Sequence, residues 1–270
     1  MNAPRILSGI YIYPIKSLGE ISQQSGQVTS RGLQYDRRWM LVDSKGNFMT
    51  QRKYPQMALL RPETTENGWI VRHTLNPEWN CEVPFSLETG PETQVPIWND
   101  TVLAVEANQE TNSWFSDMLY EPCRLVYMPE RTKRQISLKY GAPGEVVSFA
   151  DGYPLLLIGE ASLYDLNTRL ATPVGMDRFR PNLVFSGGTA YEEDTYTTFS
   201  IGDAVFKAVK TCARCVLTTV DQQTGKKGRE PLKTLATYRN VEGRVIFGMN
   251  VIPVVMNEVR VGDKVQIDSR

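Results

Sequence analysis

Two cysteines three positions apart are the residues of this sequence with the clearest chemical potential. They lie in Lys210–Asp221, which reads KTCARCVLTTVD, as Cys212 and Cys215. A C-x-x-C pair can supply two zinc ligands, form a redox-active dithiol, or place two small hydrophobic side chains in a core. The sequence around the pair bears on each of these interpretations.

A structural zinc site needs four ligands. The remaining candidates, which do not occur at paired spacing, are Cys81, Cys123 and His73. A thioredoxin-like dithiol belongs where a strand meets a helix, whereas this pair lies between two strand-like runs. The pair can therefore equally be two small buried side chains with no chemical role.

The positive charge beside the pair favours a reactive thiol. Arg214 directly precedes Cys215, and Lys210 is close in sequence. Nearby cations stabilise a thiolate relative to the thiol. A thiolate is a soft ligand that suits soft or high-valent metals, and an accessible one can also carry sulfur.

Composition excludes several classes of protein. The 270 residues contain one histidine, His73, so a multi-histidine metal site is excluded, and a Ser-His-Asp triad would need that residue. Thirty basic and thirty acidic residues balance, so we expect no nucleic-acid or membrane-surface partner. Apolar runs such as Leu155–Ile158 are far shorter than the roughly 20 residues of a membrane helix. Four cysteines and no apolar export segment favour a cytoplasmic protein with reduced thiols.

The elements that must position these residues are mostly strands, so the expected class is mainly β with a few helices (α+β). Short β-branched and aromatic runs, separated by turn residues, predict strands at Arg5–Tyr13, Arg38–Val42, Gln56–Leu60, Trp69–His73, Val102–Glu106, Ala204–Val209, Val216–Val220, Arg244–Phe247 and Val259–Ile267. Apolar spacing and a proline start predict helices at Glu110–Leu119, Glu160–Leu170 and Pro231–Tyr238. Asn99-Asp100 predicts a hairpin turn.

A polar loop, Pro129–Arg134, is the best candidate boundary between two modules. We expect a β-rich N-terminal module over residues 1–125 and a second domain over residues 126–270. The loop also carries Arg131, Lys133 and Arg134, and a second basic stretch carries Lys226, Lys227 and Arg229. Both stretches are predicted as exposed loops.

Several ordered segments, taken together, resemble one family. Besides Thr211–Asp221 they are Tyr13–Ser17, Asp36–Trp39, Ser148–Pro154, Glu160–Leu163, Phe179–Asn182, Glu230–Leu232, Phe247-Gly248 and Val261–Asp263. The cysteine segment closely resembles the signature of the MOSC domain. The chain as a whole is similar to the branch that contains the mitochondrial amidoxime reducing component and bacterial reductases of N-hydroxylated bases.

The resemblance implies a MOSC-type β-barrel with an N-terminal β-rich module and a molybdenum cofactor of the molybdopterin type. Cys215 matches the family's metal ligand and is the expected catalytic residue, while Cys212 is expected to be structural. The positions that match the family's cofactor-holding residues are Lys16, Ser17, Arg37, Asp151, Gly152, Arg180, Asn182, Arg214 and Asn250. Asn250 departs from the family, which has a tyrosine-type residue after Phe-Gly.

The residue types fit such a ligand. A phosphate or nucleotide tail calls for fixed cations with fork geometry, which arginine supplies. Lys16, Arg37 and Arg180 would repel one another if they met without an anion, and a bound phosphate would remove this repulsion. We therefore expect the three residues to form one set that binds an anion.

The activity that the resemblance implies is the reduction of N-hydroxylated compounds at molybdenum, independent of pyridoxal phosphate and suited to detoxification. No four-cysteine cluster motif is present, so electrons are expected from a separate ferredoxin- or flavodoxin-like protein and its reductase. The basic stretch at Lys226–Arg229 is a candidate docking face for this donor. The alternatives are a persulfide carrier at Cys215 and a protein that binds or handles the cofactor without turnover.

Overall fold

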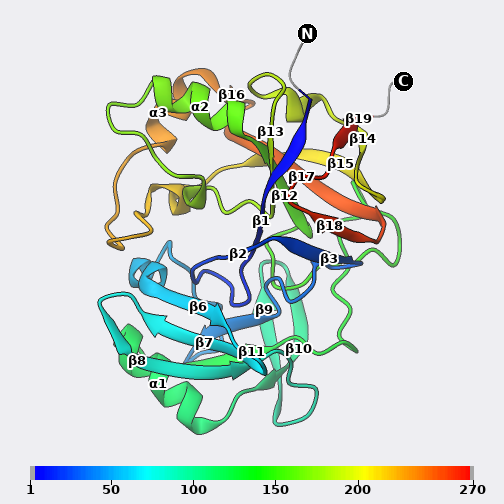
Figure 1. Cartoon of the computed structure of the whole chain (residues 1–270). Coiled ribbons are helices and arrows are strands. Elements are labelled where there is room, and N and C mark those ends of the chain that lie inside the picture. Colours follow the sequence, from blue (N-terminus) through cyan, green and yellow to red (C-terminus); the bar gives the residue numbers. More distant parts are fainter. Residues whose placement is uncertain (1–3, 268–270) are drawn as a thin grey trace.

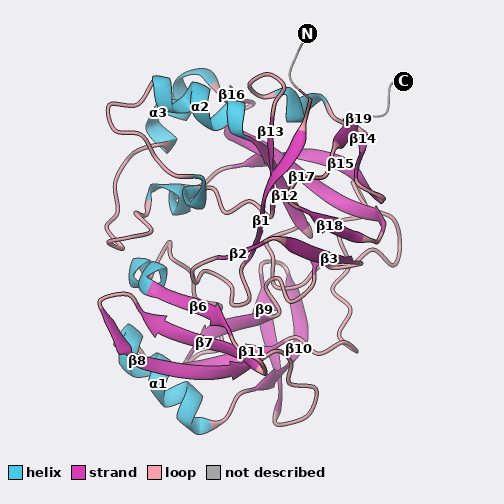
Figure 2. Cartoon of the chain, viewed as in Figure 1, coloured by secondary structure: helices cyan, strands magenta, loops and turns pink. Residues whose placement is uncertain are grey.

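A computed structural model describes residues 4–267 of the chain (Figure 1). Strands dominate, and the predicted mainly β class is confirmed (Figure 2). In this range the α-helices are α1 (Gln109–Leu119), α2 (Glu160–Thr168) and α3 (Leu232–Tyr238), close to the three predicted helices. Short 3-10 helices are η1 (Pro55–Leu59), η2 (Met176–Arg178), η3 (Glu192–Thr195) and η4 (Val216–Thr219).

The largest sheet among the described residues has nine strands. In spatial order these are β19 (Val265–Ile267), β14 (Thr198–Ile201), β15 (Ala204–Ala213), β17 (Arg244–Val255), β12 (Leu155–Gly159), β13 (Leu183–Ser186), β1 (Ile6–Ile12) and β2 (Ile21–Gln23), and β16 (Asn240–Val241) pairs with β17. β12 and β13 are parallel, and α2 makes the connection between them. Parallel neighbours need such a crossover because a tight turn cannot join them.

Smaller sheets form the rest. One contains β5 (Trp39–Asp43), β11 (Cys123–Tyr127), β10 (Asp100–Glu106) and β9 (Glu92–Ile97); a second contains β6 (Leu60–Thr64), β7 (Gly68–His73) and β8 (Asn76–Pro84); a third contains β18 (Glu258–Arg260), β3 (Ser25–Thr29) and β4 (Gly32–Leu33). β9 and β10 form a hairpin whose turn contains Trp98 and Asn99, close to the predicted turn. In Figure 1 the sheets that contain β6–β11 lie below the large sheet, whereas β3 and β18 lie beside it.

The two halves of the sequence share strands. β1 pairs with β13, and β3 pairs with β18, so early strands complete sheets whose other members come late in the chain. A division into modules 1–125 and 126–270 remains a proposal, because these ladders cross it.

The central strand β12 explains how the large sheet is buried on both faces. All five of its residues are buried. Leu155 and Leu157 belong to the main core, whereas Leu156 and Ile158 pack in a second cluster with Leu166 of α2. Alternate residues of a strand point to opposite faces, so a continuous apolar run serves two layers.

Three predicted strands are wrong in whole or in part. Residues 56–59 belong to η1, because Pro55 starts a 3-10 turn, and Leu60 is the first residue of β6. Residues 216–219 form η4, in which Thr218 Oγ1 donates to Cys215 O at 3.0 Å and Thr219 Oγ1 to Val216 O at 2.7 Å. Such local bonds compete with strand pairing. Residues 259–267 contain two short strands, β18 and β19, separated by a turn at Gly262.

Candidate active site

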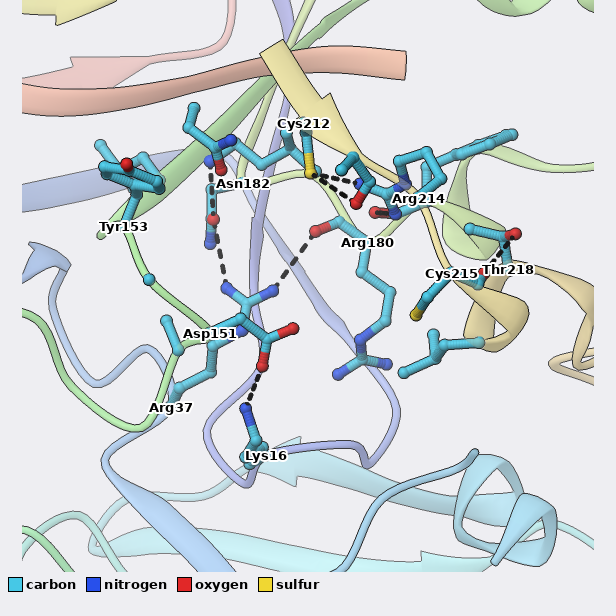
Figure 3. Close-up of a pocket in the computed structure, with 18 of the residues that line it drawn as sticks. Lys16, Arg37, Asp151, Tyr153, Arg180, Asn182, Cys212, Arg214, Cys215 and Thr218 are labelled. Carbon is cyan, nitrogen blue, oxygen red and sulfur yellow. Dashed lines mark hydrogen bonds and ion pairs between the residues drawn. The ribbon is translucent and has the colours of Figure 1, made fainter. Parts of the chain in front are cut away.

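One pocket gathers all ten residues that the sequence analysis singled out (Figure 3). They are Lys16, Ser17, Arg37, Asp151, Gly152, Arg180, Asn182, Arg214, Cys215 and Asn250. Apart from Arg37, which precedes β5, they lie on or beside β1, β13, β12, β17 and β15, which are neighbours in the large sheet. The fold therefore brings together residues from nearly the whole length of the chain.

Three of these residues have an unusual backbone. Ser17, Arg37 and Arg180 have φ values of 68°, 50° and 56°. Residues other than glycine rarely adopt this left-handed region, and such strain is found most often at functional sites. Around Arg37 it is held by backbone bonds: its N–H donates to Tyr13 O at 2.8 Å, and its carbonyl accepts from the N–H of Phe149 at 2.9 Å.

Two arginines of the pocket pack against one buried aromatic ring. The Cζ atoms of Arg37 and Arg180 lie 4.5 Å and 4.1 Å from the centre of the Tyr13 ring. The Tyr13 hydroxyl lies 3.1 Å from each of two acceptors, Glu20 Oε2 and Pro181 O. Tyr13 was not predicted as a site residue, because a tyrosine in a strand-like run is usually a core residue. The sequence signal that could have identified it is its place in the family-like segment Tyr13–Ser17.

Hydrogen bonds fix both guanidinium groups. Arg37 pairs with Asp36 at 2.5 Å and donates to Asn182 Oδ1 at 3.2 Å, as Figure 3 shows for Asn182. Arg180 Nη1 donates to Leu18 O at 2.7 Å. Burial lowers the pKa of Arg180 to about 10, and the neighbouring Arg37 acts in the same direction. The pocket thus holds positive charge that the protein only partly compensates.

An ion pair between a buried lysine and an exposed aspartate closes another side of the pocket. Lys16 is 5% exposed, and its Nζ donates to Phe149 O at 2.8 Å and to Asp151 Oδ1 at 2.5 Å. Burial lowers the pKa of Lys16, and the Asp151 carboxylate partly offsets this. The Asp151 side chain is 67% exposed, so it lies at the mouth of the pocket.

The two cysteines have different surroundings. Cys212 belongs to β15, and its Sγ accepts a hydrogen bond from Arg214 Nη1 at 3.0 Å. Cys215 is exposed at the start of η4, and no hydrogen bond to its Sγ is formed within residues 4–267. Arg214 therefore bonds to Cys212 and not to its neighbour Cys215, which its place in the sequence had suggested. The Cys215 sulfur is free to bind a ligand.

Two nitrogens of the pocket arginines have no protein acceptor. Arg180 Nη2 and Arg214 Nε are buried without a hydrogen-bond partner in the part of the chain that the structure describes. A buried donor without an acceptor costs on the order of 1–3 kcal/mol. An anion bound in this pocket would supply the missing acceptors.

The remaining pocket residues leave space or complete the wall. A Cβ atom added to Gly152 would meet nothing within 4 Å. Asn250 Nδ2 donates to Lys210 O at 3.1 Å across the β15–β17 ladder, which fixes the amide against the sheet. No group of three or more His, Cys, Asp or Glu side chains within residues 4–267 is arranged to hold a metal ion. In the same range, no helix has the length and apolarity needed to cross a membrane.

Comparison with known proteins identifies the family. A profile described as the MOSC N-terminal beta barrel domain matches residues 5–122, and one described as the MOSC domain matches residues 144–266. This chain belongs to the MOSC family. The strands of this MOSC chain accordingly form a MOSC-type β-barrel fold with an N-terminal barrel module.

The MOSC chain has curated relatives of two kinds. It is 34% identical to mitochondrial amidoxime-reducing component 1 of Mus musculus, over 96% of this chain and 81% of the relative. It is 32% identical to molybdenum cofactor sulfurase of Solanum lycopersicum, over 92% of this chain but only 33% of that longer protein. Among solved structures, the crystal structure of the YUAD protein from Bacillus subtilis aligns over 100% of this chain and 98% of the YUAD chain. The sequence identity is 12% and the TM-score is 0.46.

Proposed function

We propose that this MOSC protein holds a molybdenum cofactor in the pocket and reduces N-hydroxylated compounds. The observation that carries the proposal is the combination, in one pocket, of the free thiol of Cys215 with the unpartnered nitrogens of Arg180 and Arg214. A single exposed thiolate suits a soft or high-valent metal, and buried arginine donors suit an anionic group. The amidoxime-reducing relatives support this choice of substrate.

The residues divide into two groups by what they would hold. Cys215 would ligate molybdenum. The phosphate-bearing part would accept hydrogen bonds from Arg180 and Arg214, with Lys16 and Arg37 supplying further charge. Ser17 and Asn182 offer a hydroxyl and an amide for polar atoms of the pterin.

The bound cofactor supplies the two-electron removal of oxygen from an N–OH group. The protein's own residues keep the anion in place, hold Cys215 at the pocket wall and leave the side of Asp151 open to substrate. We propose that electrons come from a separate ferredoxin- or flavodoxin-like protein with its reductase.

A sulfur-handling function is the second candidate. Cys215 is exposed and free of hydrogen bonds within the described residues, which also suits a persulfide, and molybdenum cofactor sulfurases are among the relatives. The unpartnered arginine nitrogens favour a bound anionic cofactor over a persulfide alone, because a persulfide on Cys215 would leave them without acceptors.

The test combines metal analysis with turnover. The full chain, produced in a host that makes the cofactor, should contain molybdenum in a one-to-one ratio and reduce benzamidoxime with a chemical reductant. Cys215→Ser should lose activity and change the molybdenum spectrum, whereas the matched Cys212→Ser should retain metal and partial turnover. Labile sulfane sulfur without molybdenum would instead establish the carrier, and equal loss in both variants would refute the assignment of Cys215.

A further inference from the structure

The turn of the β9–β10 hairpin presents an exposed tryptophan in a strained conformation. Trp98 has a φ of 57° and is 45% exposed. A bulky side chain rarely adopts this backbone conformation, so the contacts around it must hold it there. Trp98 is not among the residues that the family resemblance pointed to.

Two contacts tie Trp98 to the mouth of the pocket. Its Nε1–H donates to Asp151 Oδ1 at 3.3 Å, and its ring packs against Phe48 with centroids 5.3 Å apart. Asp151 itself lines the pocket and points its carboxyl toward Lys16 (Figure 3). A loop of the N-terminal half thus places an aromatic ring beside an exposed carboxylate of the candidate site.

A planar cation already lies on this ring. The Arg52 guanidinium carbon is 4.6 Å from the Trp98 ring centre. Within residues 4–267, Arg52 makes no ion pair within 4 Å, and its Nε bonds only weakly to Thr50 Oγ1 at 3.4 Å. Cation–π attraction and the charge of the nearby Asp151 carboxylate, whose pKa the Arg52 charge helps to lower, therefore hold it on the indole, and both contacts are modest and reversible.

The Asp151 carboxylate keeps one oxygen available. Lys16 and Trp98 both donate to Oδ1, and no donor of the described residues reaches Oδ2. An aromatic face next to a free carboxylate oxygen is the arrangement that recognises a planar group with N–H donors, such as an amidine or a guanidine. Tryptophan is the best of the aromatic residues for this purpose.

We propose that Trp98 and Asp151 form a subsite for planar nitrogen bases, which the Arg52 guanidinium occupies in the free protein. The C–N plane of the base stacks on the indole, and its NH₂ group donates to Asp151 Oδ2. This inference rests on the proposed function for the class of substrate. It adds where the substrate's base is bound and which side chain must move aside.

The test measures binding of benzamidine hydrochloride to the full chain by calorimetry, with neutral benzamide for comparison. We expect benzamidinium to bind more tightly than benzamide. Trp98→Asn removes the ring and tolerates the left-handed backbone, and it should weaken binding roughly tenfold. Trp79→Asn is the matched control, since Trp79 is 46% exposed on β8, and it should leave binding unchanged.

Two further variants separate recognition from folding. Trp98→Phe keeps an aromatic face but loses the N–H, and it should give intermediate affinity. Arg52→Gln removes the competing cation and should tighten binding severalfold. Undetectable binding to the wild type, equal affinity in Trp98→Asn, or weaker binding in Arg52→Gln would each overturn the subsite.

Failure of the subsite and failure of the proposed function give different results. Benzamidinium binding needs no reductant or turnover. Trp98-dependent binding without benzamidoxime reduction would leave the subsite standing and refute the reductase. If Trp98→Asn reduces benzamidoxime with an unchanged KM, the reductase function stands and the subsite is refuted.

Discussion

The guanidinium carbon of Arg180 lies 4.1 Å from the ring centre of Tyr13, deep in the wall of the pocket. The same ring receives Arg37 at 4.5 Å. The negative face of the ring offsets part of the repulsion between these two cations. Tyr13 is therefore a positioning residue for both arginines.

We expect the Tyr13 ring and the Tyr13 hydroxyl to have different roles, the ring in holding the cofactor and the hydroxyl in stability. Tyr13→Phe keeps the ring but leaves Pro181 O and Glu20 without their donor, so we expect a loss of about 1–2 kcal/mol in the free energy of unfolding and retained molybdenum. Tyr13→Leu removes the ring and should lower molybdenum content as well. Urea unfolding and metal analysis of both variants check this, and equal metal content in the two would contradict a positioning role.

Arg180 and Arg134 form a matched pair of buried arginines, 7% and 4% exposed. Arg134 donates to the carbonyls of Ser148, Ala150 and Asp151. Arg134→Ala should therefore cost at least about 2–3 kcal/mol of stability, because buried acceptors lose their donor. Arg134 was predicted to lie in an exposed basic loop, and this prediction is wrong because its side chain is buried.

Arg180→Ala should have the opposite profile. Its side chain makes one bond from Nη1 and leaves Nη2 unpartnered, so metal-free protein should unfold at nearly the same temperature as the wild type. A charge-assisted contact to the cofactor is worth roughly 1.5–3 kcal/mol, so retention of molybdenum on dialysis should fall roughly tenfold or more. A large drop in melting temperature with unchanged metal would refute this assignment.

Docking of the electron donor should depend on Lys226 and Lys227. Both are exposed, and Lys227 donates to Arg52 O at 2.7 Å, which places this loop beside the proposed subsite. Lys226→Glu/Lys227→Glu should slow turnover with an acidic protein donor, and that turnover should fall with salt in the wild type. Turnover with a small chemical reductant should not change.

The control for docking carries the same change of charge elsewhere. Lys45→Glu/Lys139→Glu alters two exposed lysines in other loops and should leave donor-driven turnover nearly unchanged. If the Lys226/Lys227 double variant also loses activity with the chemical reductant, or if donor-driven turnover of the wild type does not depend on salt, the docking hypothesis is wrong.

Stability should fall as pH rises through the acid range because of Glu193. This residue of η3 is fully buried, and Ser162 Oγ donates to its two carboxyl oxygens at 2.8 and 2.9 Å. Burial raises its pKa to about 7, so the folded chain binds a proton that the unfolded chain releases above pH 4.5. The resulting penalty grows between those values to about 3 kcal/mol.

Glu193→Gln should remove this dependence. Urea midpoints measured at pH 5 and pH 8 should differ less in the variant than in the wild type. Glu66→Gln, at an exposed position, should keep the wild-type difference. Parallel curves for the wild type and Glu193→Gln would disprove a titrating Glu193.

The sequence predicted the helices and most strands because their apolar spacing is regular. The errors lie where local chemistry outweighs propensity. Val216–Val220 is rich in β-branched residues, yet its threonine hydroxyls bond to carbonyls three residues back and close a 3-10 turn. This turn leaves Cys215 exposed at its start rather than within a ladder.

The site residues were predicted because several segments together resemble the MOSC family, but the geometry of these residues was not predicted. The left-handed backbones of Ser17, Arg37 and Arg180 carry no signal in residue type, because only glycine and asparagine announce such conformations. The partner of Arg214 is Cys212, two residues earlier at the end of β15, because alternate residues of an extended chain point to the same side, whereas the next residue, Cys215, points elsewhere. Trp98 reaches the site from another sheet.

The shared ladders have a consequence for biosynthesis. The pocket needs the early Lys16 and the late Asn250, and its sheet is complete only when β17 pairs with β12 and β15. At about 5–20 residues per second, a ribosome takes roughly 10–50 s to translate the segment between them. During that interval no binding site exists, so insertion of the proposed cofactor must follow translation. A cell that lacks the cofactor would therefore accumulate folded, empty protein that can be filled later.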